Sequence, residues 1–316
     1  MSLPAARVVF FGSGEIAIPS FVRLIEAGPR PVALVTQPDK PAGRHRSTLT
    51  PPPIKRVALE AGIPVLQPES ARDEAFLAEL RDLAPDLIVV MAYGQILSKA
   101  LIGIPRLACV NLHGSLLPRH RGASCVQAAI EAGDSETGVT VMHVAPKLDS
   151  GDIIHAERIP TSEHDTGGSI HDRLAQVAAE ALSAALPGLL DGSAPRVPQD
   201  AALATYAPKL ERDEGRIDWS GDAARIARRI RAYDPWPGTW CLVEGGGEPK
   251  RFKIFAAEAG IESIGTPGTV VPGDDGRPRV ACGSGHLRLV EVQPDGARRM
   301  PAEAWFQGLR SLPRFL

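Results

Sequence analysis

Short apolar runs alternate with helical patterns along the first two-thirds of the chain. This alternation is typical of a parallel sheet wrapped by helices, which belongs to the α/β class. The run Asp86–Met91 is apolar almost throughout, as expected of a central strand that is buried on both faces. The predicted strands are Arg7–Phe11, Pro31–Thr36, a short one near Val65, Asp86–Met91, Leu107–Leu112, Val139–Val144 and Ile153–Ile159, and the predicted helices are Pro19–Ala27, Ile54–Ala61, Arg72–Leu83 and Gly168–Leu190.

The pattern changes after residue 190. Residues 191–208 are rich in Pro, Gly, Ser and Ala and have no apolar period, which predicts a linker. One helical segment, Asp222–Arg231, and several short apolar runs between Gly, Pro and Asp clusters follow, a pattern typical of a small β-barrel. We therefore expect one domain over residues 1–190 and a second over residues 209–316. The predicted barrel strands are Thr239–Val243, Phe252–Ala256, Thr269–Val271, Arg279–Ala281 and Leu287–Val292.

The composition is that of an ordinary folded protein, since 44% of the 316 residues are hydrophobic and 23% are charged. A net charge of −2 argues against a protein that coats nucleic acid by bulk electrostatics, although a local basic face would still allow binding.

No stretch approaches the roughly 18–20 apolar residues of a membrane span, and the N-terminus has no apolar signal core. We expect a cytoplasmic protein that does not bind membranes.

The cysteines and histidines do not form a recognisable ligand set. The four cysteines are scattered without a close pair, so we expect reduced, mostly buried thiols and no zinc site or disulfide. No i, i+4 helical pair occurs among His113, His120, His143 and His155. We therefore predict no metal site.

Polar side chains with catalytic potential lie at the end of the predicted strand Leu107–Leu112. Asn111 and His113 are two residues apart, so both point to one face near the carboxyl end, where open α/β sheets bind ligands. An amide and an imidazole side by side can donate hydrogen bonds to one developing oxyanion. Asp149, on a Gly-containing turn, supplies a carboxylate that can orient the imidazole or hold it cationic. On spacing alone, a structural histidine is the commoner alternative.

The first strand runs into Phe11-Gly12-Ser13-Gly14-Glu15, which invites comparison with a nucleotide-binding turn. Ala17 takes the place of the third glycine of that fingerprint, and Thr36-Gln37 stand where an acidic residue would be expected. We interpret the glycines as a tight strand-to-helix turn. No serine lies in a Gly-x-Ser-x-Gly elbow, so a hydrolase triad is poorly supported as well.

Basic side chains cluster in three segments. Each could be a solvated surface or a contact for a phosphate backbone, and a common nucleic-acid face in the second domain requires its two clusters to point the same way. The clusters are Lys40, Arg44, His45 and Arg46 in the loop Gln37–Lys55; Arg225, Arg228, Arg229 and Arg231 on the predicted helix; and Lys250, Arg251 and Lys253 beyond it.

Two motifs carry a resemblance to a known family. The run Asn111-Leu112-His113-Gly114-Ser115-Leu116-Leu117-Pro118, followed by Arg119-His120-Arg121-Gly122, resembles the signature of the folate-dependent formyltransferases. The turn Leu148-Asp149-Ser150-Gly151-Asp152 resembles their second signature. That superfamily also includes enzymes that act on ribonucleotides and amino-sugar nucleotides, so the motifs imply formyl transfer without fixing the acceptor.

Other segments resemble the methionyl-tRNA formyltransferase family in particular. They are Thr36–Arg44, similar to its inserted basic loop; Thr205–Leu210 with Arg216–Trp219; and Ile230–Pro237. The resemblance covers essentially the whole chain, in order. It implies a Rossmann-like formyl-transfer domain with a mostly parallel sheet, followed by an OB-like β-barrel that helps to hold tRNA. Ser13-Gly14-Glu15 and Ser124-Cys125 depart from the commoner family sequences.

The resemblance implies transfer of the formyl group of 10-formyltetrahydrofolate to the α-amine of initiator methionyl-tRNA, and we expect a monomer. Asn111 and His113 would hold the oxyanion, and Asp149 would support His113 and relay protons. The folate would lie against Met91, Tyr93, Gly94, Ile96, Leu97, Ser115, Leu116, Leu117 and Pro118. The tRNA would contact Lys40, Arg44, His45, Arg46, Lys209, Arg228 and Arg231. The alternatives are a formyltransferase with a sugar or ribonucleotide acceptor and a non-catalytic RNA-binding protein, which would leave the catalytic trio unexplained.

Overall fold

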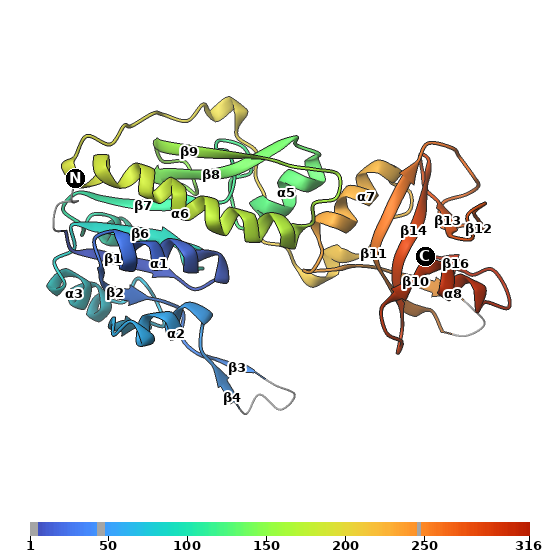
Figure 1. Ribbon diagram of the computed structural model, residues 1–316, viewed down its shortest axis with the longest axis horizontal. Helices are drawn as coiled ribbons and strands as arrows, with labels where there is room; N and C mark the ends of the chain where they lie inside the picture. The colour runs from blue at the N-terminus through green and yellow to red at the C-terminus, as the bar shows by residue number, and fades with distance from the viewer. Residues whose placement is uncertain (1–5, 43–47, 245–247) are drawn as a thin grey trace. The chain divides into compact units, whose positions relative to one another are not determined.

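The computed structural model describes residues 6–42, 48–244 and 248–316 (Figure 1). The chain divides into two compact units, which are described separately below. Unit 1 contains the chain up to Cys125 together with Glu136–Pro160 and His171–Ala207. Unit 2 contains Val126–Ser135, Thr161–Ile170 and Pro208–Leu316.

Unit 1 is built on a seven-stranded sheet with the order β5-β2-β1-β6-β7-β8-β9. The pairs from β5 to β7 are parallel, and the pairs β7–β8 and β8–β9 are antiparallel. This confirms the mostly parallel, Rossmann-like sheet that the apolar runs and the family resemblance predicted. The strands are β1 (Val8–Gly12), β2 (Pro31–Val35), β5 (Val65–Leu66), β6 (Leu87–Met91), β7 (Ala108–His113), β8 (Glu136–His143) and β9 (Ile153–Pro160).

Helices cover both faces of this sheet, which explains why β1 and β6 are buried along their whole length. Phe10 points to one face, where its ring centroid lies 5.2 Å from that of Phe21 on α1. Phe11 points to the other face, 6.3 Å from Phe76 on α3. The helices up to residue 191 are η1 (Glu15–Ala17), α1 (Ile18–Ala27), α2 (Pro53–Glu60), α3 (Glu74–Asp82), α4 (Lys99–Ile102), α5 (Cys125–Ala132) and α6 (Gly167–Asp191).

Two segments expected to be irregular contain more structure than their composition predicted. In the basic loop, β3 (Lys40–Ala42) and β4 (Thr48–Thr50) pair as an antiparallel hairpin (Figure 1). The expected linker 191–208 packs with unit 1 as far as Ala207. Its backbone is paired there, because Val197 bridges Ile153 and Tyr206 bridges Arg121. The segment also includes the short helix η2 (Ala201–Leu203).

Two short segments from the first half of the chain pack within unit 2. The Arg228 side chain donates from Nε to the carbonyl of Glu131 at 3.0 Å, and Arg231 donates from Nη1 to the carbonyl of Asp165 at 2.8 Å. These contacts join α7 to segments that precede it by many residues. Unit 2 therefore contains two short segments that precede residue 191, beside the part of the chain from Pro208 onward.

Unit 2 contains an antiparallel series with the order β12-β13-β14-β11-β10-β16, and β15 lies beside β14. A bridge between Thr269 and Arg314 and a hydrogen bond from Phe315 N to Gly268 O join its two ends, so the sheet forms a nearly closed barrel. The prediction of a small barrel is confirmed. Its elements are η3 (Arg212–Gly215), α7 (Ala223–Ala232), β10 (Thr239–Glu244), β11 (Lys250–Gly260), β12 (Val270–Pro272), β13 (Pro278–Ala281), β14 (His286–Pro294), β15 (Met300–Pro301), α8 (Ala302–Gln307) and β16 (Arg314–Phe315).

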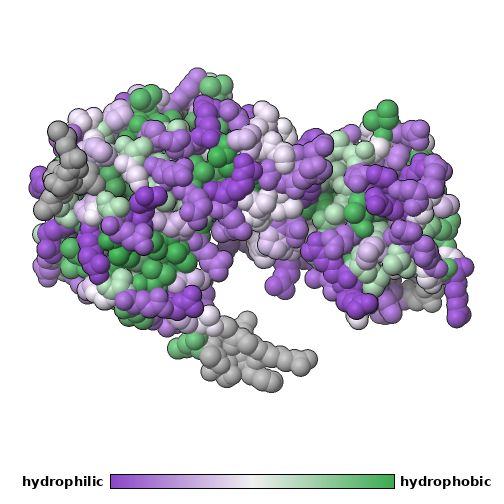
Figure 2. All heavy atoms as spheres, viewed as in Figure 1, coloured by the Kyte–Doolittle hydropathy of each residue, from purple (hydrophilic) through white to green (hydrophobic). Residues whose placement is uncertain are grey.

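The helix α7 packs one face against the barrel. Ile226 and Ile230 are buried in the same cluster as Phe252 and Ile254 of β11, whereas Arg225 remains exposed. This division follows the i, i+4 spacing of the apolar residues. Figure 2 shows hydrophilic side chains spread over much of the visible surface of each unit, as expected when the apolar positions are used in the cores.

Candidate active site

The end of β7 carries Asn111 and His113 at the carboxyl edge of the parallel strands. In the sheet register, Asn111 lies beside Val90 of β6 and Met142 of β8, and His113 lies beside Thr140 of β8. Residues two apart on a strand project from the same face, so both side chains leave the sheet on one side. They therefore lie at the edge where open α/β sheets bind ligands.

The imidazole of His113 is held in one orientation by its neighbours. His113 is 6% exposed, and its Nε2 donates a hydrogen bond to the carbonyl oxygen of His120 at 2.9 Å. A carbonyl oxygen only accepts hydrogen bonds, so Nε2 carries a proton. This leaves Nδ1 as the ring nitrogen that can act on a ligand.

Asp149 lies beside that ring, on the turn between β8 and β9. Its Oδ2 is 3.7 Å from Nδ1 of His113 and accepts a hydrogen bond from the backbone N of Gly122 at 2.7 Å. The distance of 3.7 Å is longer than a hydrogen bond. The carboxylate can therefore stabilise a positive charge on the ring without using the Nδ1–H as a donor.

The surroundings of His113 favour its charged form. Burial of the ring opposes the charge, but the Cys125 sulfur, the Asp149 carboxylate and the His120 carbonyl outweigh burial and raise the pKa of His113 to about 9. A pKa raised in this way favours an imidazolium with a proton on each nitrogen. It can then donate from Nδ1 to a negatively charged oxygen.

Positive-φ backbone conformations occur at His120 and Asp149 of this site and at Ala92, which follows the neighbouring strand β6. Among the described residues, the non-glycine positions with positive φ are Ala84, Ala92, His120 and Asp149, and the values at the last three are 49°, 56° and 45°. Ala92 follows β6, His120 holds the His113 ring, and Asp149 faces it. A residue with a Cβ keeps such a conformation only where its surroundings fix it, and such residues cluster at functional sites.

The residues expected to contact folate fall into buried and exposed groups. Tyr93 is 2% exposed and packs edge-on against Phe11, with centroids 5.1 Å apart. Its hydroxyl has no hydrogen-bond partner among the described residues, and burial raises the pKa of Tyr93 to about 12. Met91 is also buried, at the end of β6. In contrast, Gly94 is exposed and Ile96 is 69% exposed.

The second group of expected folate residues forms the loop after β7. The Ser115 hydroxyl donates to the carbonyl of Arg119 at 2.7 Å, and the backbone N of Leu117 donates to the Thr140 hydroxyl at 3.1 Å. The first hydrogen bond lies within the loop, and the second attaches the loop to β8. The Ser115 hydroxyl and the Leu117 N–H therefore stabilise the loop itself. Leu97, Leu116 and Pro118 are half-buried.

The residues expected to contact tRNA lie in both units. Lys40 is exposed on β3, and Lys209 is exposed at the start of the last segment of unit 2, Pro208–Leu316. Arg44, His45 and Arg46 lie outside the described residues. Arg228 and Arg231 are half-buried, and each donates a hydrogen bond to a backbone carbonyl, as described above.

Two features, one in the candidate active site and one in unit 2, were not predicted from the sequence. Cys125, which departs from the family motif, contributes to the charge state of His113, and that departure was the only available signal. In the barrel, the guanidinium carbons of Arg251 and Arg216 lie 3.9 and 5.9 Å from the ring centroid of Trp240. Arg216 and Trp240 are far apart in the sequence, so no local pattern predicts this stack.

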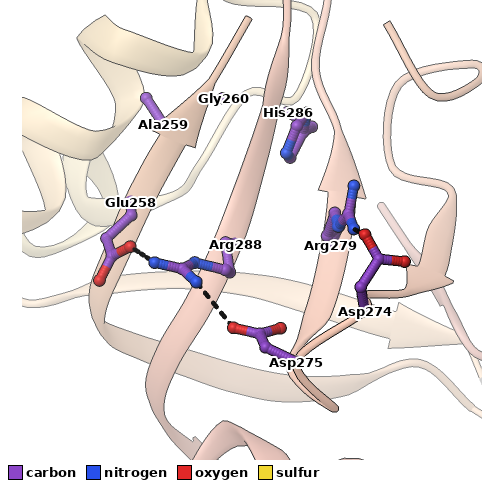
Figure 3. Close-up of a pocket in the computed structure, with 8 residues that line it drawn as sticks. All are labelled: Glu258, Ala259, Gly260, Asp274, Asp275, Arg279, His286 and Arg288. Carbon is purple, nitrogen blue, oxygen red and sulfur yellow. Dashed lines mark hydrogen bonds and ion pairs between the residues drawn. The ribbon is translucent and has the colours of Figure 1, made fainter. Parts of the chain in front are cut away.

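Unit 2 also contains an open pocket of about 360 Å³ between β11, β13 and β14 (Figure 3). Its arginines are paired with carboxylates, because Arg288 contacts Asp275 at 2.7 Å and also Glu258, and Arg279 contacts Asp274 at 2.6 Å. Each arginine of the pocket is therefore neutralised by at least one carboxylate. Nothing in this arrangement favours a particular ligand.

Within residues 6–42, 48–244 and 248–316, no group of three or more His, Cys, Asp or Glu side chains is arranged to hold a metal ion. In the same ranges, no helix is both long and apolar enough to span a membrane.

The fold and the strand-end site define the class of the protein as an α/β enzyme with an appended barrel. Two family models match it, "Formyl transferase" over residues 6–186 and "Formyl transferase, C-terminal domain" over residues 209–310. A methionyl-tRNA formyltransferase from Akkermansia muciniphila is 50% identical over 296 residues, which are 93% of this chain and 94% of the relative. The chain belongs to the methionyl-tRNA formyltransferase family, as its motifs predicted.

Solved structures of low sequence identity share the fold. WlaRD, a sugar 3N-formyl transferase, has a TM-score of 0.66 and 16% identity, and the match covers 93% of this chain and 100% of that chain. HypX from Aquifex aeolicus in complex with tetrahydrofolic acid has a TM-score of 0.62 and 19% identity, with coverage of 96% and 48%. These likenesses confirm the fold class.

Proposed function

We propose that this enzyme transfers the formyl group of 10-formyltetrahydrofolate to the α-amino group of initiator methionyl-tRNA, for translation initiation. The observation that carries the proposal is the His113 ring beside Asp149, at the sheet edge that also bears Asn111. We place the enzyme in the cytoplasm, where charged tRNA is made, as a monomer that needs no metal ion. A sugar or ribonucleotide acceptor is the less supported alternative, because the near-full-length relative is a methionyl-tRNA formyltransferase.

The reaction begins when the neutral amine attacks the formyl carbon. A carbon–nitrogen bond forms, and the formyl oxygen becomes an oxyanion. The Asn111 amide and Nδ1–H of His113 donate hydrogen bonds to that oxygen. Donors fixed before the reaction are worth most where charge develops, and the buried, oriented ring of His113 meets this requirement.

Protons must then move from the amine to the folate nitrogen. Asp149 accepts the amine proton through water and returns a proton to the leaving nitrogen as the old carbon–nitrogen bond breaks. The proton count therefore balances within one turnover. The 13% exposure of the Asp149 side chain is compatible with access for such a water molecule.

The folate is proposed to lie across the turn after β6 and the loop after β7. The exposed Gly94 and Ile96 can contact it directly, and Leu97, Leu116 and Pro118 are half-buried at the same edge. The buried Met91, Tyr93, Ser115 and Leu117 shape the floor of this site. Apolar side chains with a few backbone polar groups are the usual lining of such a site.

The tRNA contacts are proposed to begin at the β3–β4 hairpin. Lys40 is exposed on it, and Arg44, His45 and Arg46 follow in the sequence. The base of the hairpin is held by Lys55, whose Nζ lies 2.9 Å from Asp39 and 2.7 Å from the Gln67 side chain. A fixed base allows basic side chains to meet phosphates at a defined place.

Unit 2 supplies further proposed contact residues, which include Lys209 and, on α7, Arg228 and Arg231. To these we add Arg216 and Arg251, which flank Trp240, and Lys253, which is exposed beside Trp240 in the β10–β11 register. Arginines next to an aromatic ring can bind phosphates and stack on bases. Arg228 and Arg231 use part of their hydrogen-bonding capacity within unit 2.

The acceptor is tested by one formyl-transfer assay with charged initiator tRNA, charged elongator tRNA, an amino-sugar nucleotide and a glycinamide ribonucleotide. We expect rapid transfer to initiator methionyl-tRNA and little to the others. Preference for the sugar or the ribonucleotide would establish the alternative enzyme. No transfer to any acceptor would overturn the assignment of an enzyme.

Replacing Arg44 by glutamine should raise the KM for tRNA and leave the KM for folate unchanged. If one phosphate contact is lost, the slope of log affinity against log salt should fall by about one. The measurement is tRNA affinity across a salt series. Arg23→Gln, an exposed arginine on α1, is the matched control. An unchanged slope in the Arg44 variant would remove this residue from the proposed tRNA surface.

A further inference from the structure

Gln199 connects the segment after α6 to the two loops of the active site. Its Nε2 donates to the carbonyl of Asp149 at 3.0 Å and to the carbonyl of Gly151 at 2.7 Å. Its Oε1 accepts from Nε and Nη2 of Arg121 at 3.1 and 2.7 Å. One amide therefore joins the Asp149 turn to the loop that contains Gly122, whose backbone N binds the Asp149 carboxylate.

Arg121 fixes the orientation of that amide. It is 2% exposed, so its guanidinium is almost completely removed from water and requires acceptors inside the protein. Its backbone is also fixed, because Arg121 N donates to Thr205 O and Ala207 N donates to Arg121 O. Since guanidinium only donates, Oε1 of Gln199 must face it, and the amide NH2 must face the turn.

The Asp149 turn requires such a restraint. Asp149 has a φ of 45°, which is unfavourable for a residue with a Cβ. Two residues later, a Cβ on Gly151 would lie 1.7 Å from the carbonyl oxygen of His143, so this part of the turn is pressed against the end of β8. The two hydrogen bonds from Gln199 hold the carbonyls on either side of Ser150.

We propose that Gln199 is a positioning residue, which holds the Asp149 turn so that the carboxylate stays beside Nδ1 of His113. This inference rests on the proposed function, because it assumes that Asp149 takes part in formyl transfer. Gln199 acts through the backbone of the turn and has no contact with the reacting atoms. Small displacements of a reacting or supporting group cost about 10²-fold in rate, which sets the expected effect.

Two substitutions distinguish the donor end of the Gln199 amide, which contacts the turn, from the acceptor end, which contacts Arg121. Gln199→Glu keeps an acceptor for Arg121 but removes both donors to the turn, because an ionised carboxylate cannot donate. Gln199→Ala removes both ends. We expect kcat for methionyl-tRNA to fall by about 10- to 100-fold in each variant, with the KM values for tRNA and folate nearly unchanged. Gln293→Glu is the matched control, since the Gln293 amide also donates to a backbone carbonyl, that of Ala297 in unit 2.

The pH profile provides a readout that a purely structural role would not change. The titratable groups that act on His113 are Asp149 from the turn and Cys125 from α5, together with the carbonyl of His120. In Gln199→Ala, which adds no charge, a displaced carboxylate should move the alkaline decline of kcat to lower pH. Gln199→Glu adds a charge of its own, so it is used only for the comparison of kcat and KM.

The outcomes distinguish this inference from the proposed function. A normal kcat in Gln199→Glu would overturn the positioning role, and so would an alkaline decline that stays in place in Gln199→Ala although Asp149→Asn shifts it. If Asp149→Asn also has normal kcat, the assignment of the catalytic trio fails first. Melting temperatures show whether a variant has lost its fold. If Gln199→Ala does not fold, the kcat of Gln199→Glu, which keeps the Arg121 contact, tests the positioning role.

Discussion

Asn111→Ala should lower kcat for formyl transfer by about 10²–10³-fold, the usual cost of removing one oxyanion donor. Asn111 is half-buried at the end of β7 and projects from the same face as His113. Its amide would donate most strongly to the formyl oxygen once negative charge develops there. The KM for folate should therefore change little, because the ground-state carbonyl binds this donor more weakly.

The measurement is steady-state formylation of methionyl-tRNA together with equilibrium binding of folate. Asn111→Asp keeps the shape but replaces the donor by a negative charge, so we expect it to be slower than Asn111→Ala. Gln307→Ala, which removes an exposed amide on α8, is the control. Near-normal turnover of Asn111→Ala with normal folate binding would show that this amide is not the oxyanion donor.

The sequence predicted the parts of the site that depend on local pattern. The apolar runs identified β1, β6 and β7, because a strand buried on both faces needs apolar residues at nearly every position. Once β7 was located, the two-residue spacing of Asn111 and His113 placed them on one face. The family motifs then assigned Asp149 to the same centre, and the structure places it 3.7 Å from the His113 ring.

The remaining features depend on contacts between distant segments. The contacts of Gln199 with Arg121 and the Asp149 turn join three separate segments, and a Pro- and Ala-rich composition gives no sign of them. The same composition predicted an independent linker, whereas the backbone of Val197 pairs with Ile153. Membership of Val126–Ser135 in unit 2 likewise depends on partners on α7, as the contact from Arg228 to Glu131 illustrates.

Asp149→Asn should reduce kcat by at least about 10²-fold and should also change its pH dependence. In the wild type, the pKa of His113 is raised to about 9, so the imidazolium and the activity should persist from neutral pH to that value and decline above it. The asparagine side chain can still accept from the Gly122 N–H, but it carries no negative charge. The pKa of His113 should then fall, and the alkaline decline should begin at a lower pH.

The pH dependence separates two functions of the carboxylate. A lower kcat with the alkaline decline in its original place would mean that Asp149 handles protons and that Cys125 and the His120 carbonyl keep His113 charged. Cys125→Ser tests that possibility directly, because it changes the other side chain that favours the charged ring and leaves Asp149 in place. If only Asp149→Asn shifts the decline, the carboxylate controls the charge of His113. If kcat and the pH profile are both normal in Asp149→Asn, Asp149 has no part in the reaction.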